Sequence, residues 1–335
     1  MAVLSTLALS LAVASPLAKQ AKEAGLVAIP SSLKEVRKLV DNPNNLISND
    51  KVELGKMLFF EPRISKSGLI SCNTCHNLAT GGVDGVAAAI GHKWTANPHH
   101  LNSPTVYNAV FFDAQFWDGR DPDLEKQAQG PILAPPEMAA TKEHVVKVVT
   151  SMPGYVDAFK KAYGKDVVID YVKIADTIGL FERTLVTPAP YDDFLNGDEK
   201  ALTSAEKEGL KTFIDKGCTS CHTGIALGGS MQAFGVTGKY KYADVGDFKG
   251  DKNGLVKVPT LRNINETAPY FHNGAVTTLK EAIIEMGRIQ LGVKISDKEA
   301  ASIQNFFNAL EGKKPEIVYP QLPKPTASTP AKNVN

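Results

Sequence analysis

Cys72-Asn73-Thr74-Cys75-His76 has a second copy farther along the chain, Cys218-Thr219-Ser220-Cys221-His222. A Cys-x-x-Cys-His run is typical of c-type haem attachment, in which both thiols bond to the porphyrin and the histidine binds the iron. The two copies use all four cysteines of the chain. A zinc site with four thiolate ligands is the alternative, but it does not require a histidine after each cysteine pair. The sequence therefore predicts two covalently bound haems.

The composition is that of an ordinary globular protein. The 335 residues suffice for two domains with their own cores, and 43% of them are apolar. The formal net charge is only +1, whereas a nucleic-acid-binding protein normally carries a basic face. Beyond the N-terminal segment, no stretch reaches the about 18 consecutive apolar residues that a membrane span needs. We therefore expect no nucleic-acid partner and no membrane span in the mature protein.

The N-terminal segment has features of an export signal. Residues 2–14 form an apolar run that ends in Ala12-Val13-Ala14, a pattern typical of a signal cleavage site, although the usual basic start is absent. An apolar tail is the alternative. Covalent haem attachment in bacteria takes place outside the cytoplasmic membrane. We therefore predict an atypical signal in residues 1–20 and a periplasmic location.

Helix signals dominate the rest of the chain. One helix is expected from Asp50 to Phe60. Apolar residues also recur at helical spacing between Asp170 and Leu185. Few segments alternate with the period of a strand, so the sequence predicts a mainly α fold. Four more helix starts are marked by capping boxes, at Ser32-x-x-Glu35, Thr203-x-x-Glu206, Thr278-x-x-Glu281 and Ser296-x-x-Glu299.

The chain also contains an internal repeat. Pro104-Thr105-Val106-Tyr107-Asn108 matches Pro259-Thr260-Leu261-Arg262-Asn263, and from each proline 15 residues lead to a glycine. Each haem motif is followed by a pair of glycines as well. We therefore predict two tandem cytochrome c-like haem domains related by internal duplication. The expected segments are an N-terminal haem domain at residues 21–187, a C-terminal haem domain at residues 188–314 and a Pro-rich surface tail at residues 315–335.

The two copies differ at the position that decides what a haem does. Met286 follows the second copy at the end of a predicted helix, where a cytochrome c domain supplies a methionine to the iron. A methionine ligand raises the reduction potential of the haem. The equivalent position in the first copy is Pro131, or Ile132 with a gap of one residue, and neither side chain binds iron. Unless Met286 is only a core residue, the second haem transfers electrons and the first is open to a small oxidant.

Histidines outside the motifs are candidates for the remaining ligand of the first haem. His92 lies 16 residues after His76, in the loop Gly91-His92-Lys93-Trp94. A histidine in a glycine-flanked loop can move onto an iron and away from it. His272 stands at the position of Trp117 in the repeat, so we expect it near the second haem. An ordinary loop histidine is the alternative for each.

The chain resembles the bacterial dihaem cytochrome c peroxidases from about residue 22 to residue 322. The combination of matching stretches is far more specific than any single motif. The resemblance implies that the N-terminal haem is the low-potential haem that reacts with peroxide and that the C-terminal haem receives the electrons. The stretches that carry it are Leu69–His76, Gly91-His92, Asn102–Thr105, Gln115–Arg120, Gly130–Met138, Thr267–His272 and Met286-Gly287.

The resemblance implies the iron ligands. His76 and His222 correspond to the proximal ligands of the two haems, and Met286 corresponds to the distal ligand of the second haem. His92 corresponds to the removable sixth ligand of the peroxidatic haem. In many members of the family, reduction of the high-potential haem releases this histidine and opens the site.

The resemblance also implies the residues around the reacting haem. Gln127 and Glu137 correspond to residues of the distal pocket. A carboxylate suits O–O cleavage, which needs a base for the peroxide proton and an acid for the leaving oxygen. Trp117 corresponds to the aromatic residue between the two haems. From the residues alone, a surface acid remains the alternative for Glu137 and a core tryptophan for Trp117.

A calcium site is implied in the same way. The side chain of Asn102 and the carbonyl groups of Thr267 and Pro269 correspond to the family's calcium ligands at the domain interface. Oxygen ligands from different parts of a chain suit Ca²⁺, although three are too few without water. We therefore expect a bound Ca²⁺ in addition to two covalent haem c groups.

The predicted activity is the reduction of H2O2 to water, with electrons from a small periplasmic cytochrome c or cupredoxin. The resemblance also implies a homodimer. One alternative is a dihaem electron carrier without peroxide chemistry, against which Glu137 and the missing methionine of the first copy argue. The other is a related dihaem enzyme that oxidises tryptophans of a protein, in which a tyrosine replaces the distal methionine. Met286 argues against this second alternative.

Overall fold

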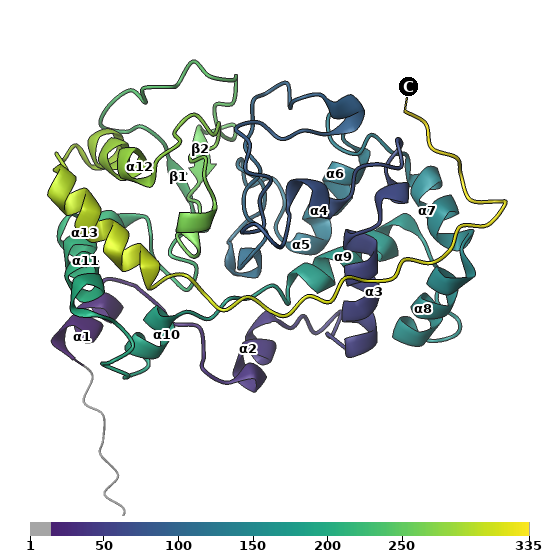
Figure 1. Ribbon diagram of the computed structural model, residues 1–335, viewed down its shortest axis with the longest axis horizontal. Helices are drawn as coiled ribbons and strands as arrows, with labels where there is room; N and C mark the ends of the chain where they lie inside the picture. The colour runs from purple at the N-terminus through teal and green to yellow at the C-terminus, as the bar shows by residue number, and fades with distance from the viewer. Residues whose placement is uncertain (1–14, 335) are drawn as a thin grey trace, which may run out of the picture.

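The computed structural model describes residues 15–334, and residues 1–14 of the predicted signal segment lie outside the described residues. The described chain is mainly helical, as predicted, with one two-stranded antiparallel sheet of β1 (Met231–Ala233) and β2 (Leu255–Lys257) (Figure 1). The α-helices are α1 (Pro16–Glu23), α2 (Leu33–Val40), α3 (Asn49–Phe59), α4 (Cys72–Cys75), α5 (Leu124–Gln127), α6 (Gln129–Leu133), α7 (Lys142–Thr150), α8 (Pro153–Tyr163), α9 (Tyr171–Glu182), α10 (Pro190–Leu195), α11 (Ser204–Asp215), α12 (Leu279–Met286) and α13 (Asp297–Asn308). Short 3-10 turns occupy Pro62–Ile64, His92–Trp94, Ala109–Phe111, Cys218–Ser220 and Ile264–Glu266, and a π-turn spans Gly287–Leu291.

Most helix starts follow local capping signals in the sequence. Helix α3 begins after Ser48, whose hydroxyl accepts a hydrogen bond from a backbone N–H of the first turn. Such a cap satisfies one of the N–H groups that have no partner inside the helix. The four predicted capping boxes are confirmed as helix starts in the same way, by Ser32 for α2, Thr203 for α11, Thr278 for α12 and Ser296 for α13.

The helices pack around two large hydrophobic cores. Helices α3, α7, α8 and α9 bury their apolar faces in one core, and α11, α12 and α13 bury theirs in the other. The two groups lie side by side in Figure 1. Helix α1 packs on the second core although it begins the described chain, since Ala18 and Ala21 are fully buried there.

The helix that precedes each haem motif packs in the same way in both groups. Helix α3 lies against α9, and α11 lies against α13. A Cβ atom on Gly55 of α3 would lie 2.3 Å from the carbonyl oxygen of Thr177, and one on Gly209 of α11 would lie 2.1 Å from that of Ser302. Only glycine permits such close approach of two helices. The repeat found in the sequence is therefore also a repeat of packing.

The two copies of the Pro-Thr repeat are joined at Thr187. Asn108 and Asn263 both have left-handed backbone conformations, with φ of 61° and 58°. Their Nδ2 atoms donate to the same Thr187 hydroxyl, at 2.8 and 2.9 Å respectively. Thr187 is fully buried, so this junction is shielded from water. The two halves are thus fixed to each other behind the haem motifs.

The chain after α13 runs across the first group of helices (Figure 1). The ring of Tyr319 packs edge-on against Phe60, with 5.2 Å between the ring centroids. Farther on, Arg63 Nη1 donates to the carbonyl oxygen of Pro323 at 2.9 Å. This tail therefore adds contacts between the two halves of the molecule. No helix within residues 15–334 is long and apolar enough to cross a membrane.

Candidate functional site

The first haem motif is a single helical turn, α4, with its histidine at the end. Ser71 N donates to Thr74 Oγ1 at 2.9 Å, which caps the turn and fixes the spacing of Cys72 and Cys75. Nδ1 of His76 lies 3.0 Å from the carbonyl oxygen of Pro104. Because Nδ1–H donates to that carbonyl, Nε2 is left free as an iron ligand. Burial lowers the pKa of His76, which favours the neutral imidazole that binds metal.

The second motif presents its histidine in the same way. Nδ1 of His222 lies 3.0 Å from the carbonyl oxygen of Leu227, and burial lowers the pKa of this histidine too. Cys75 lines one cavity, whereas Cys218 and Cys221 line another. No group of three or more His, Cys, Asp or Glu side chains in the described part of the chain is arranged so that it could hold a metal ion. This geometry excludes the zinc cluster and fits two separate haems.

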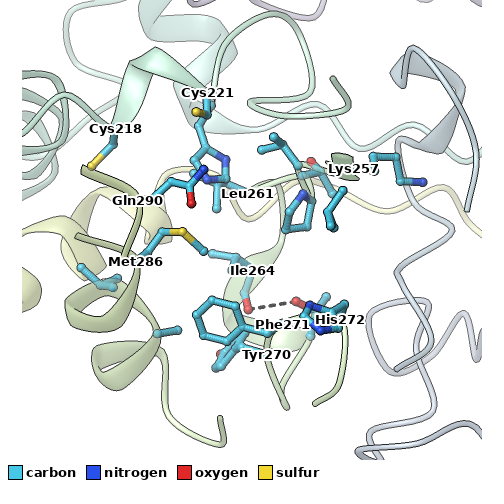
Figure 2. A pocket seen from close by; sticks show the side chains of 18 of the residues that line it. Cys218, Cys221, Lys257, Leu261, Ile264, Tyr270, Phe271, His272, Met286 and Gln290 are labelled. Carbon is cyan, nitrogen blue, oxygen red and sulfur yellow. Dashed lines mark hydrogen bonds between the residues drawn. The ribbon is translucent and has the colours of Figure 1, made fainter. Parts of the chain in front are cut away.

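The second cavity has a volume of about 180 Å³ and contains a second candidate iron ligand. Met286 ends α12 and is followed by the π-turn, a feature that often occurs at functional sites. Figure 2 shows its thioether reaching into the space in front of Cys218 and Cys221. His222 lines the same cavity, so the residues fit a haem held between His222 and Met286.

The first cavity is larger, about 670 Å³, and no methionine lines it. Gln127, Pro131 and Glu137 line it together with His76, so the structure brings these residues to one place. Within residues 15–334, neither the Gln127 amide nor the Glu137 carboxylate has a hydrogen-bond partner. Burial raises the pKa of Glu137, and the positive charge of Arg120 partly opposes the increase. A carboxyl group and an amide are thus available to a small molecule in this cavity.

His92 lies beside the first cavity and does not line it. Its backbone N–H donates to the carbonyl oxygen of Glu137 at 2.7 Å. The side chain is 7% exposed, and both ring nitrogens lack a hydrogen-bond partner among the described residues. A Cβ atom on Gly91 would lie 2.0 Å from the carbonyl oxygen of Pro136, so only glycine fits there. Buried polar atoms in proteins normally have a hydrogen-bond partner. Two ring nitrogens without one therefore fit a histidine that binds a metal when its loop moves.

Trp117 lies between the two cavities and lines both of them. Its indole Nε1 donates to the carbonyl oxygen of Asn102 at 2.9 Å, and its ring centroid is 6.3 Å from that of His272. His272 lines the second cavity, where we expected it, and burial lowers its pKa to about 4. Trp117 therefore forms part of the wall that the two cavities share.

The three expected calcium ligands are close together. Asn102, Thr267 and Pro269 all line the second cavity. Asn102 Nδ2 donates to the carbonyl oxygen of Pro269 at 2.6 Å, and Asn102 N donates to that of His272 at 2.8 Å. To bind a cation here, Asn102 would have to turn its amide oxygen, instead of Nδ2, toward the site. Ca²⁺ takes about six to eight oxygen ligands, so water would have to supply most of them.

Sequence reasoning assigned no role to several charged residues that line the first cavity, among them Arg120, Glu182 and Lys257. Glu182 is 5% exposed at the end of α9, and burial followed by the nearby Glu125 raises its pKa to about 8. Its signal in the sequence was an acid directly after a run of apolar helical residues. Lys257 is 3% exposed although lysine is among the residues that are least often buried. No local pattern marked its burial.

Comparison with known proteins identifies the family. The family model described as "Di-haem cytochrome c peroxidase" matches residues 49–200. The cytochrome c551 peroxidase of Pseudomonas aeruginosa is 46% identical over 318 residues, 90% of this chain and 88% of that protein. The cytochrome c551 peroxidase of Nitrosomonas europaea is 49% identical over 291 residues, 84% of this chain and 86% of that protein.

A solved structure has the same fold. It is a MauG-like protein associated with microbial copper homeostasis, with a TM-score of 0.71 and 26% identity over 82% of this chain and 93% of its own. Three features point to the same family. The chain is mainly helical, its two haem motifs line separate cavities, and it is identical to these peroxidases at nearly half of the positions compared. The chain belongs to the di-haem cytochrome c peroxidase family.

Proposed function

We propose that this peroxidase reduces H2O2 at the haem held by His76, with electrons that arrive through the haem held by His222. The overall reaction is H2O2 + 2 e⁻ + 2 H⁺ → 2 H2O. The observation that carries the proposal is the difference between the two cavities. Met286 faces the second motif, whereas Gln127 and Glu137 line the first cavity without hydrogen-bond partners in the described chain. One site is therefore suited to electron transfer and the other to binding a small oxidant.

The residues of the first motif hold the group that performs the redox chemistry. Cys72 and Cys75 would hold the haem by thioether bonds, and His76 would bind its iron through Nε2. When bound, haem c supplies an iron centre that binds peroxide and exchanges electrons. The hydrogen bond from His76 Nδ1 to Pro104 O holds the imidazole in the tautomer and orientation that this ligation needs.

Glu137 is the proposed general acid and base. As a carboxylate it accepts the proton of the inner peroxide oxygen, and as a carboxylic acid it returns the proton to the leaving oxygen. Burial raises its pKa, which brings the two protonation states closer in free energy at neutral pH. The Gln127 amide, on the same cavity wall, donates a hydrogen bond that orients the peroxide.

Trp117 is the proposed connection between the two haems, because it lines both cavities. The hydrogen bond from its Nε1 to Asn102 O and the packing against His272 fix the indole plane. An aromatic ring held between two redox centres divides the gap between them, so each electron has a shorter distance to cross through space.

His92 is the proposed removable ligand of the first haem. In the position described here it lies beside the cavity, with both ring nitrogens unpartnered among residues 15–334. The loop that carries it is bonded through His92 N to the carbonyl oxygen of Glu137. Movement of His92 onto the iron would therefore also disturb the position of the acid and base.

Several finer assignments belong to the same proposal. The peroxidase relatives imply a cytochrome as electron donor, and a cupredoxin is an alternative donor. We assign the haem domains to residues 21–187 and 188–314, a division supported by the junction at Thr187. A signal in the part of residues 1–20 that precedes α1, a periplasmic location, a homodimer and Ca²⁺ at Asn102, Thr267 and Pro269 complete the proposal. The signal would end before Pro16, because Ala18 of α1 is buried in the second core.

The experiment uses the full chain loaded with both haems. H2O2 consumption is measured with a reduced c-type cytochrome and with reduced azurin as a cupredoxin, before and after partial reduction of the protein. We expect consumption in the half-reduced state, together with a high-spin signal from the first haem. A half-reduced protein that shows neither would identify an electron carrier. Tyrosine ligation of the second haem would instead support oxidation of protein side chains.

A further inference from the structure

Lys257 is a buried cation that no step of the proposed function uses. It ends β2 and is only 3% exposed. Its backbone N–H donates to the carbonyl oxygen of Trp117 at 2.8 Å, and it pairs with Met231 across the small sheet. The backbone of Lys257 is thus fixed at the residue that separates the two haem cavities.

The ammonium group of Lys257 has no ion-pair partner in the described chain. Its Nζ lies over the ring of Phe112, 4.7 Å from the ring centroid, and it forms no ion pair or hydrogen bond within residues 15–334. Burial lowers the pKa of Lys257 to about 7, with a smaller upward effect from Asp118 and a downward effect from Arg120. Burying a charge without a partner is energetically costly, so buried charges in proteins are normally paired.

The side chain of Lys257 is directed toward the first haem site. Lys257 lines both cavities, and Figure 2 shows it extending away from Met286 and toward the N-terminal half of the chain. The other charged residues and histidines on the wall of the first cavity are His76, His99, Asp118, Arg120, Glu137, Glu182, Asp247 and Lys249. None of the carboxylates among them forms an ion pair with Lys257.

Arg120, the other cation near this position, already has an ion-pair partner. Arg120 Nη1 lies 2.8 Å from Asp118 Oδ1, and its guanidinium group stacks on Phe116 at 3.4 Å from the ring centroid. Its side chain is also 52% exposed, so solvent screens its charge. Lys257 is therefore the cation of this cavity wall that is both buried and unpaired.

We propose that Lys257 binds a carboxylate of the haem held by His76, so that the C-terminal half of the chain completes the haem site of the N-terminal half. Haem carries two propionate carboxylates, and an ammonium–carboxylate hydrogen bond compensates for the loss of hydration at Lys257. The inference rests on the proposed function in placing the reacting haem at His76.

The bound cation has an electrostatic consequence for that haem. Reduction adds one negative charge to the haem, and a nearby positive charge stabilises the reduced form. The effect is larger in a site with little water, because the local dielectric constant is low. Lys257 should therefore raise the reduction potential of the first haem, acting as a positioning residue for the haem carboxylate and not as a catalytic group.

The test is a redox titration of the full, haem-loaded chain with Lys257→Met. Midpoint potentials are followed by optical and EPR spectra, which distinguish the two haems, and the haem content per chain is measured in parallel. We expect the potential of the first haem to shift downward in Lys257→Met and to stay near the wild-type value in Lys257→Arg. Lys252→Met, which removes an exposed lysine from the same segment, should leave it unchanged.

An unchanged potential of the first haem in fully loaded Lys257→Met would overturn the proposal, as would a shift confined to the second haem. If the methionine variant takes up haem poorly, Lys257→Gln keeps a polar side chain without the charge and should show the same downward shift. The titration needs no peroxide. If the wild-type protein fails to consume H2O2, the proposed function is refuted. The effect of Lys257 on the reduction potential would still be decided by the titration alone.

Discussion

Replacement of Glu137 by glutamine tests the proposed chemistry of the first cavity most sharply. The amide has nearly the same size as the carboxyl group, so the cavity shape and the backbone bond from His92 N to Glu137 O remain. The substitution removes the group that takes and returns a proton. Glu182, a buried carboxyl group on the same wall, has its pKa raised to about 8 and is largely protonated at neutral pH, so it is a poor substitute base.

The expected loss follows from the role of a single acid–base group. General acid–base catalysis contributes about 10²–10⁴-fold, or about 3–5 kcal/mol of transition-state stabilisation at 1.36 kcal/mol per tenfold. We therefore expect kcat/KM for H2O2 to fall by about 10²–10⁴-fold in Glu137→Gln. The rate of electron uptake from the donor should not change, because the proposed entry point for electrons is the second haem.

The assay measures H2O2 consumption under steady-state conditions with a reduced cytochrome as donor. Glu208→Gln, at an exposed glutamate that lines neither cavity, is the matched control. Because burial raises the pKa of Glu137, wild-type activity should rise with pH through that raised pKa, and this acidic limb should disappear in Glu137→Gln. Wild-type kcat/KM in Glu137→Gln, with both haems present, would refute the reasoning.

The other predictions concern the second haem, the loop of His92 and stability. Met286→Leu should lower the potential of the second haem and slow turnover with the donor, because a methionine ligand raises that potential; an unchanged potential would exclude Met286 as a ligand. His92→Gly should make the protein active without prior reduction, and an unchanged need for reduction would rule out His92 as the gate. Asp192→Asn should lower the free energy of unfolding by about 3–5 kcal/mol in denaturant titrations, because Arg262, which is 0% exposed and bonded twice to Asp192, loses its counter-charge. A denaturant midpoint of unfolding in Asp192→Asn equal to that of the wild type would contradict this prediction.

The features that could be predicted from the sequence are local or covalent in origin. Cap side chains act within one helical turn, so Ser32 and Thr203 marked the starts of α2 and α11 correctly. The haem motifs require a fixed spacing of neighbouring residues, and the repeat that led from Pro104 to Pro259 is present as the common junction at Thr187.

The features that could not be predicted depend on contacts between distant segments. The three-residue strand that buries Lys257 is too short to leave a period in the sequence. Helix α1 lies at the start of the chain, yet Ala18 packs in the core of the C-terminal half. The position of His92 beside the cavity depends on the close contact of Gly91 with Pro136, which only the folded loop creates.

A spectroscopic redox titration with a peroxide assay at each potential tests the central claim most directly. The claim is that one haem supplies electrons while the other reacts. We predict that H2O2 consumption begins when the Met286-ligated haem is reduced, while the haem of His76 is still oxidised and shows a high-spin signal. If both haems stay six-coordinate at every potential and no peroxide is consumed, the division of roles between the two haems is wrong.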